Sequence, residues 1–335
     1  MVRTWGAVPL NTEPVETINN TAETYKRRTS ADTVMTQVKA DIEKSLQLFG
    51  SSNTIAAGKR VYWNRVASLI LKGDVFIWTG THMGGGSADF TTAKTALQEV
   101  RNLQSATLDL QGNYADIFDP NKKSNNKEII FAINYELQQA QMSMFSSFQV
   151  NSIQAATLSF TQAATPTVSS VYPYVNGANR VGMNQAMINR LTAAPADQRI
   201  TNSFKVMYSN ASPFATRGVF LTKYAGTTAG TSQVYNNDFP IYRYADVLLL
   251  LAEAKARLGE DPSAEINAIR LRAYGTGYTP YVNSDVTTNM NAILEEYLRE
   301  FIGEGKRWWA LRRAGDSYVY ANLNPTYFSA TSTAK

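Results

Sequence analysis

Residues 293–315 read ILEEYLREFIGEGKRWWALRRAG, and apolar side chains recur there as neighbouring pairs every four residues. This spacing places the apolar side chains on one face of an α-helix, so the stretch predicts a helix with a buried stripe. The stripe continues through Gly305 to Trp308 and Trp309, and we expect both indole rings to extend the buried face. Gly303 and Gly305 are expected to allow a bend or a close helix contact. The apolar pairs are Ile293 with Leu294, Tyr297 with Leu298, and Phe301 with Ile302.

The charges of this stretch are nearly balanced. From Glu295 to Arg313 there are four acids and five bases, so no cationic strip exists and nucleic acid is not expected as a partner. Two carboxylates on one helix could be offered as the acids of a glycosidase. Because basic side chains lie within reach, we interpret them instead as solvated ion pairs on the helix surface. The carboxylate pairs are Glu295 with Glu296 and Glu300 with Glu304, and the bases are Arg299, Lys306 and Arg307.

Helical patterns also precede this stretch. Residues 241–258 carry an apolar stripe that ends at Gly259, and Asp261 is expected to cap the next helix, with Pro262 in its first position. Further upstream, Asp197 and Arg199 are close enough to share a turn, and we expect them to pin a loop. The C-terminal part therefore reads as a helical hairpin followed by the helix of residues 293–315.

The N-terminal part predicts three more helices. Residues 30–49 form an amphipathic pattern with Ser30 or Asp32 as its cap, and residues 60–78 carry a broad apolar face. Four glycines within residues 79–89 are expected to break that helix, and Asp89 to cap the third one. Such antiparallel pairs stack into tetratricopeptide-like arrays. The predicted fold class is mainly α, with tetratricopeptide-like helical hairpins and long irregular loops. A short buried strand is expected within residues 128–135.

The composition limits the chemistry. Of 335 residues, 44% are apolar and 18% charged, which suits a packed globular chain. The absence of cysteine excludes disulfides and thiolate ligands, and His82 is the single histidine. We therefore expect no catalytic residue, no metal site and no cofactor. No apolar run approaches the roughly 20 residues of a membrane-spanning helix.

An uncharged segment is the most informative about function. It lies between Glu136 and Arg180 and contains no charged residue. We expect a set of surface loops there. Sugars are uncharged, need amide and hydroxyl partners, and rest their C–H faces on aromatic rings. The sequence VYPYVNGANR at 171–180 supplies suitable groups, although the tyrosines of an ordinary capping loop could equally pack on the helices. The candidate glycan-binding residues are Tyr172, Tyr174, Asn176 and Asn179, with Trp78 and His82 as weaker candidates at the edge of the first hairpin.

Three C-terminal segments resemble, in order and spacing, the closing helices of the SusD-like (RagB/SusD) outer-membrane lipoproteins. They are FPIYRYADVLLLLAEAKARLG, INAIRLRAYG and ILEEYLREFIGEGKRWWALRRAG. Similar elements reach back to RTWGAVPLNTEP near the N-terminus, through KEIIFAINY, ADQR and LTKY. The resemblance covers roughly residues 2–313. In the family the RTWGAVPL-like element follows a substantial N-terminal segment, so the chain resembles an N-terminally truncated member.

The resemblance implies a SusD-like α-α superhelix that binds oligosaccharides at the cell surface without catalysis. It further implies delivery to a SusC-like TonB-dependent transporter, and an outer-membrane lipoprotein of a Bacteroidota-type bacterium. The signal peptide and lipidated cysteine of the family are not in this sequence. We expect one domain over 1–323, followed by a flexible tail over 324–335. Its parts are helical hairpins at 1–135, a loop-rich ligand region at 136–240 and C-terminal helices at 241–323.

Two other functions remain open from the sequence. Helical hairpins of this kind could bind a partner peptide in a concave groove, as a tetratricopeptide-type protein-interaction scaffold. A glycoside hydrolase would need two carboxylates facing each other across a cleft, and the uncharged segment argues against one.

Overall fold

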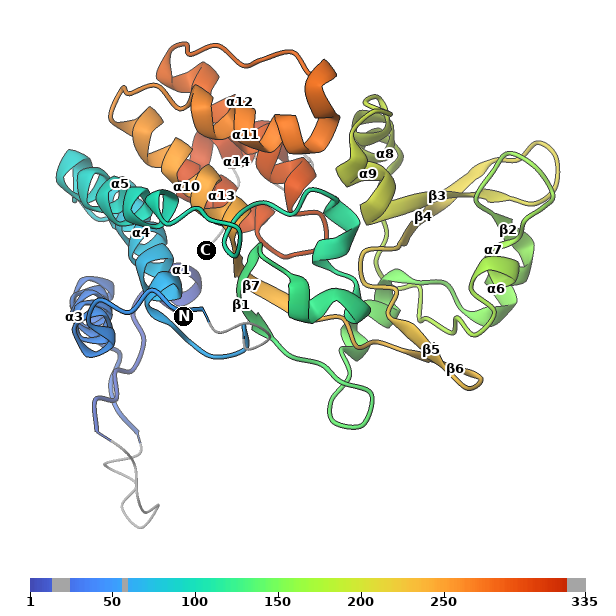
Figure 1. Cartoon of the computed structure of the whole chain (residues 1–335), viewed down its shortest axis with the longest axis horizontal. Coiled ribbons are helices and arrows are strands. Elements are labelled where there is room, and N and C mark those ends of the chain that lie inside the picture. Colours follow the sequence, from blue (N-terminus) through green and yellow to red (C-terminus); the bar gives the residue numbers. More distant parts are fainter. Residues whose placement is uncertain (14–24, 56–59, 324–335) are drawn as a thin grey trace.

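The computed structural model describes residues 1–13, 25–55 and 60–323, so the tail predicted over 324–335 lies outside the described residues. Figure 1 shows a helical body on one side and a smaller lobe of strands and short helices on the other. The helices of the body are α1 (Val2–Trp5), α3 (Ala31–Phe49), α4 (Arg65–His82), α5 (Gly86–Asn102), α10 (Tyr244–Arg257), α11 (Ser263–Tyr274), α12 (Val286–Glu300), α13 (Arg307–Ala314) and α14 (Asp316–Asn322).

The remaining elements lie between α5 and α10, apart from η4 (Gly275–Gly277). Strand β1 (Ile129–Ile133) pairs antiparallel with β7 (Phe239–Arg243) beside the helices. The lobe spans residues 143–234, and its largest sheet has the order β2-β3-β4. Its elements are η3 (Ser143–Phe148), α6 (Ser152–Thr157), β2 (Leu158–Ser159), α7 (Val168–Val171), α8 (Gln185–Thr192), α9 (Gln198–Ser203), β3 (Phe204–Ser209), β4 (Thr216–Leu221), β5 (Thr227–Ala229) and β6 (Ser232–Val234). The segments η1 (Tyr114–Ile117) and η2 (Pro120–Asn125) connect the lobe side to the body.

The predicted N-terminal helices are present, with shifted boundaries. Ser30 caps α3 by accepting a hydrogen bond of 3.2 Å from the Thr33 N–H, as expected. Helix α4 continues to His82, so the break predicted within residues 79–89 is present, but the expectation that the helix ends at residue 78 was wrong. Gly80 lies within the helix. A Cβ at this position would come within 2.5 Å of the Phe90 ring of α5. Its role is close helix packing and not termination.

The predicted cap at Asp89 was also wrong, because α5 begins at Gly86 and Asp89 lies inside its first turn. The Asp89 carboxylate instead accepts hydrogen bonds from the Thr79 hydroxyl of α4 and, at 2.9 Å, from Lys39 Nζ of α3. This residue therefore joins three helices. An acid in a first turn is also favourable for the helix dipole.

The C-terminal hairpin follows the prediction closely. Helix α10 ends just before Gly259, whose φ of 72° is in the left-handed region. Asp261 accepts a hydrogen bond of 2.7 Å from the Ser263 N–H, but α11 begins at Ser263 with Pro262 at the cap position, so the predicted cap at Asp261 lies one residue too early. Nearly every side chain of α10 is buried, which makes it the centre of the main hydrophobic core.

The stretch at 293–315 folds as two helices with a turn between them. Helix α12 ends at Glu300, and Gly303 and Gly305 adopt φ values of 77° and 72°, which confirms the expected bend. Because of this bend the apolar stripe does not continue unbroken. Trp308 is 38% exposed, so the prediction that both indole rings are buried was wrong for this residue. Trp309 is half-buried.

The glutamates of this stretch differ most from the sequence-based interpretation. Glu296, Glu300 and Glu304 are between 0% and 3% exposed, so their ion pairs lie in the interior, whereas Glu295 does form the expected helix pair with Arg299, at 2.9 Å. Arg243 of β7, itself fully buried, contacts Glu300 Oε1 at 2.6 Å and Glu304 Oε1 at 2.9 Å. The reason is tertiary: β7 brings a guanidinium to the end of α12, where its planar fork contacts both carboxylates.

A second buried cluster adjoins the first. Arg199 of α9 contacts Asp197 Oδ2 and Glu296 Oε2, each at 2.7 Å. Asp197 and Arg199 share a turn as expected, but this turn is the start of α9 and not a loop, and the pair ties the lobe to α12. Lys223, which follows β4, donates to Glu304 Oε1 at 2.7 Å.

The uncharged segment is more ordered than predicted. Instead of loops alone it forms η3, α6, β2 and α7, and β2 pairs antiparallel with β3. A compact hydrophobic cluster lies beneath these elements and includes Val150, Val168, Val175 and Phe220, each no more than 2% exposed. The segment therefore builds a small core of its own.

Within the described ranges, no helix has both the length and the apolar character needed to cross a lipid bilayer.

Candidate functional site

A polar cavity of about 450 Å³ opens on the lobe, between α6, the end of β3 and the start of β4. Val150 and Leu158 form its apolar part. Its polar lining consists of amides, hydroxyls and one guanidinium, and no carboxylate of the described residues lines it. These polar residues are Gln154, Thr157, Asn179, Ser209, Asn210 and Arg217.

Asn179 is the sequence-predicted residue that lines this cavity. Its Nδ2 donates a hydrogen bond of 3.2 Å to Gln154 Oε1, and its backbone adopts a φ of 47°, which is uncommon outside glycine. Gln154 forms a capping box with Asn151 at the start of α6, so its position is fixed as well. The cavity thus presents amide groups that the backbone holds in place.

The turn that carries Asn179 is held by backbone hydrogen bonds. The N–H groups of Gly177 and Asn179 donate to Val150 O and Gln149 O at 2.8 and 2.9 Å. Only glycine fits at 177, because a Cβ there would lie 2.1 Å from Gln149 O. This close approach sets the geometry of the NGAN turn at residues 176–179.

The two tyrosines differ in their surroundings. The Tyr172 ring stacks on Phe220 with centroids 4.6 Å apart and meets Phe160 edge-on at 6.0 Å. It therefore packs on the small core of the lobe. Val150 and Leu158, which line the polar cavity, belong to the same core. Tyr174 is 37% exposed, and Asn176 is exposed next to it.

Trp78 and His82 lie on α4, on the opposite side of the molecule from the lobe (Figure 1). Trp78 is 5% exposed and its ring centroid is 4.4 Å from that of His82. His82 Nε2 is 2.7 Å from Arg312 O, so its contact is structural. The fold does not bring these two residues together with the four on the lobe.

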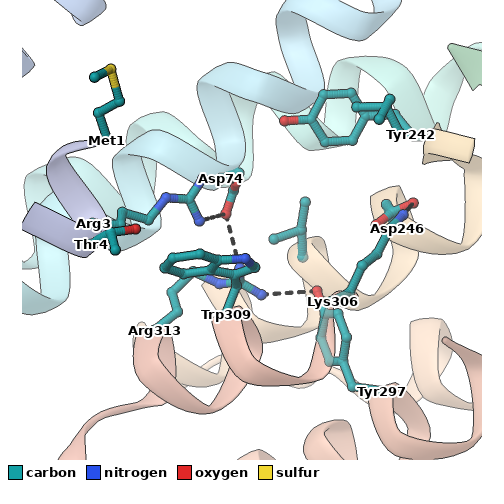
Figure 2. A pocket seen from close by; sticks show the side chains of 12 residues that line it. Met1, Arg3, Thr4, Asp74, Tyr242, Asp246, Tyr297, Lys306, Trp309 and Arg313 are labelled. Atoms are coloured by element: carbon teal, nitrogen blue, oxygen red, sulfur yellow. Dashed lines mark hydrogen bonds and ion pairs between the residues drawn. The ribbon is translucent and has the colours of Figure 1, made fainter. Parts of the chain in front are cut away.

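A second cavity, of about 340 Å³, lies where α1, α4, α10 and α13 meet (Figure 2). Asp74 of α4 accepts from Arg313 at 2.9 Å and also pairs with Arg3. Burial opposes the charge of Asp74, but the two guanidinium groups outweigh burial and lower its pKa. Trp309 lies beside this group, with the Arg3 guanidinium 5.6 Å from its ring centroid.

Asp246 at the other end of this cavity accepts from Lys306 Nζ and from the Arg243 N–H. Burial raises its pKa, and the neighbouring cations oppose that rise. Both acids of the cavity are thus already paired with bases. This arrangement holds the KRWW segment, residues 306–309, against the body. Because its charged groups are paired with one another, this cavity offers fewer free polar groups to a ligand than the polar cavity on the lobe does.

Sequence reasoning missed several residues of the polar cavity. Ser209, Asn210 and Arg217 reach it through the β3–β4 turn, and Asn210 N donates to Thr157 O at 3.1 Å. No local pattern marks them, because only strand pairing places residues 154 and 217 beside the same cavity. Arg217 is also the single charged group that lines it.

Comparison with known proteins agrees with the resemblance. Residues 196–334 match the SusD family. A SusD superfamily protein from Bacteroides vulgatus ATCC 8482 has a similar structure, with a TM-score of 0.83 and 32% identity over 95% of this chain and 70% of that one. The chain belongs to the SusD family. B. fragilis NanU is likewise similar to this SusD-family chain, with 35% identity, a TM-score of 0.83, and coverage of 95% of this chain and 68% of NanU.

Two further relatives extend the comparison. The SusD-like protein P38 of Formosa agariphila is 25% identical over 93% of this chain, and the chain spans 62% of the length of that relative. Surface glycan-binding protein A from Bacteroides thetaiotaomicron, in complex with laminarihexaose, shares the fold, with a TM-score of 0.61. At 18% identity, covering 86% of this chain and 62% of that one, the likeness concerns the fold alone.

Proposed function

We propose that this SusD-family protein binds oligosaccharide at the cell surface and carries out no bond chemistry. The observation that carries the proposal is the polar cavity on the lobe, which combines fixed amides and hydroxyls and has no carboxylate in its lining. Sugar hydroxyls need such partners, whereas hydrolysis needs two facing carboxylates. Surface glycan-binding protein A has the same fold and is in complex with laminarihexaose. This complex supports the choice of ligand class.

The binding site we propose has Asn179 at its centre, with Tyr174 and Asn176 on the exposed turn beside it. Tyr172 supports this turn from below through its contact with Phe220. Trp78 and His82 remain a separate candidate site on α4, and a ligand that contacts the lobe does not reach them.

Isothermal titration against a panel of oligosaccharides tests the proposal. For a ligand that binds, Asn179→Ala should weaken affinity about tenfold, since it removes hydrogen bonds made in a partly desolvated cavity. Asn291→Ala provides the matched control, because Asn291 is exposed on α12 and far from the cavity in sequence. Equal affinities for the two variants would refute this placement of the site.

The tyrosines require separate variants. Tyr174→Ala changes an exposed ring and should affect binding alone, whereas Tyr172→Ala also removes a packing contact of the lobe core. A double Tyr172→Ala/Tyr174→Ala variant that is folded and binds with unchanged affinity would exclude both rings from the site.

The finer proposal is delivery of the bound glycan to a SusC-like TonB-dependent transporter, with the protein attached to the outer membrane by a lipid anchor. It rests on membership of the SusD family. Co-purification with the TonB-dependent transporter encoded beside this gene tests it, and a gene without such a neighbour would contradict it. The protein-interaction scaffold remains the alternative, and peptide binding without glycan binding would favour it.

A further inference from the structure

The lobe carries an uneven distribution of charge. Residues 143–234 contain six bases and a single acid, Asp197, which is fully buried against Arg199. Two other bases of the lobe are paired with acids of α12 and the following turn, Arg190 with Glu295 and Lys223 with Glu304. Three exposed cations have no carboxylate within ion-pair distance among the described residues. They are Arg180, Lys205 and Arg217.

Two of these cations line cavities. Arg217 lines the polar cavity described above, and Lys205 lines a second lobe cavity of about 540 Å³ beside β3. In each case the cation is the only charged residue that the described part of the chain contributes to the lining. Three further cavities are lined by both acids and bases, as in the cavity of Figure 2.

The cavity at Lys205 also offers an aromatic surface. Lys205 Nζ lies 5.1 Å from the Phe160 ring centroid, and Tyr208 of β3 lines the same cavity. A ring beside a cation suits a sugar that carries an anionic substituent, because the C–H face can rest on the ring while the anion meets the ammonium.

The energetic argument favours an anionic ligand. When a ligand covers an unpaired cation, the cation loses contact with water, and a neutral ligand compensates that loss only in part. A carboxylate or sulfate compensates it with a charge-assisted hydrogen bond, which is roughly twice as strong as a neutral one. Two cavities that each hold one unpaired cation therefore select against fully neutral chains.

We propose that the lobe binds an acidic oligosaccharide, whose carboxylate or sulfate groups pair with Arg217 in one cavity and Lys205 in the other. This inference rests on the proposed glycan-binding function and names the class of glycan. The two possible sources of negative charge, uronic acids and sulfate esters, share the same chemistry toward a guanidinium or an ammonium.

The test uses the whole chain and four hexasaccharide probes measured by isothermal titration. These are an oligogalacturonide, the same oligogalacturonide with its carboxylates reduced to alcohols, a chondroitin sulfate hexasaccharide and neutral laminarihexaose. A thymidine hexanucleotide serves as the control for charge alone, because it is a polyanion but not an oligosaccharide. We expect at least one acidic hexasaccharide to bind about tenfold more tightly than its neutral counterpart, with affinity that falls as salt rises.

The variants are Arg217→Gln, Lys205→Gln and the double variant, with Lys44→Gln as the matched control. Lys44 is exposed on α3 and donates to Gln47 without a carboxylate partner, so it resembles the tested cations in all but location. Each lobe variant should weaken binding of the acidic probe about tenfold, and the control should leave it unchanged. Neither the lobe variants nor the control should change the affinity for laminarihexaose.

The outcomes separate this inference from the function on which it rests. Binding of the neutral probes alone, sensitive to Asn179→Ala, would overturn the acidic class and retain glycan binding. Binding of none of the probes would count against both. Equal affinity for the hexanucleotide would show a non-selective response to anions and would also overturn the proposal.

Discussion

Arg243 lies in the middle of a cluster of buried carboxylates. Its guanidinium is fully buried and contacts Glu300 and Glu304 within 2.9 Å, as well as Glu128 of the segment before β1. A fully buried charge is tolerated only when it is paired and hydrogen-bonded, and here one cation neutralises part of the charge of three acids. Arg272 of α11 supplies a second guanidinium to Glu128 at 3.0 Å.

Replacing Arg243 with methionine should lower the free energy of unfolding by about 3–5 kcal/mol, because it leaves buried carboxylates without their partner. Urea unfolding followed by circular dichroism measures this. Arg190→Met is the control. The side chains of Arg190 and Glu295 are 43% and 26% exposed, so their ion pair should contribute no more than about 1 kcal/mol to the free energy of unfolding. Similar losses in the two variants would contradict the structural role of Arg243.

The pKa of Glu304 links this cluster to pH. Burial opposes the charge of Glu304, but Arg243, Lys223 and Lys306 outweigh burial and lower the pKa from 4.5 to about 2. The unfolded chain therefore binds a proton near pH 4.5 that the folded chain binds only near pH 2. The stability contributed by this group is fully present above pH 4.5 and is lost as the pH falls toward 2.

Glu304→Gln should make stability less dependent on pH in this window. The free energy of unfolding of the wild type should fall between pH 4.5 and pH 2 by on the order of 3 kcal/mol more than that of the variant. Urea midpoints at half-unit pH steps measure the difference. Glu43→Gln, which changes an exposed acid paired with Lys72, should keep the wild-type slope, and an identical slope for Glu304→Gln would contradict the assignment.

At the scale of elements, the α4–α5 hairpin depends on two glycines. A Cβ at Gly73 would lie 2.5 Å from Leu97 Cγ, and one at Gly80 equally close to the Phe90 ring. The backbone of α4 therefore approaches the side chains of α5 more closely than any larger residue permits. The same approach explains why glycine, normally a weak helix former, lies inside α4 without ending it.

Gly73→Val should destabilise the protein by about 3 kcal/mol, because overpacking forces the buried Leu97 side chain and α5 to move. Thermal unfolding provides the measurement. Gly112→Val is the control, since no atom lies within 4 Å of a Cβ built there and its φ is not in the left-handed region. A Gly73 variant as stable as the control would show that the two helices are not tightly packed.

At the scale of the whole molecule, the body and the lobe have separate hydrophobic clusters. The largest one joins α4, α5, α10, α11 and α12, whereas the lobe cluster centres on Phe220 and Val150. A third cluster between them includes Phe145 and Tyr224, whose rings stack with centroids 3.9 Å apart. The lobe is therefore expected to open locally without unfolding of the body.

Phe220→Ala tests this separation. It removes the ring that stacks on Tyr172, and should cost about 3–5 kcal/mol locally, as for other large core truncations. Hydrogen exchange should show loss of protection in β2, β3 and β4 with α4 and α10 unchanged, and glycan binding should weaken as well. Ile153→Ala, at a position of α6 that is 81% exposed, is the control. Uniform loss of protection over the body would mean that the two parts unfold together.

Local patterns in the sequence determined the helices and most of their ends. Periodic apolar residues and the cap at Ser30 act within one or two turns, so they can be predicted without knowledge of the fold. The resemblance to the SusD family came from the same helices. The position of Asn179 in the NGAN turn could be anticipated too, because the turn chemistry is local.

Only the tertiary structure decided which charges are buried and how the site is lined. The pairing of Arg243 with Glu300 joins residues 57 positions apart, and nothing in either segment distinguishes it from an exposed helix pair. Arg217 and Asn210 similarly reach the polar cavity because β3 pairs with β4, and that pairing turned a segment read as loops into a sheet with its own core. The physical reason is that periodicity and capping are short-range, whereas burial, pairing and cavity lining depend on which distant segments the chain brings into contact.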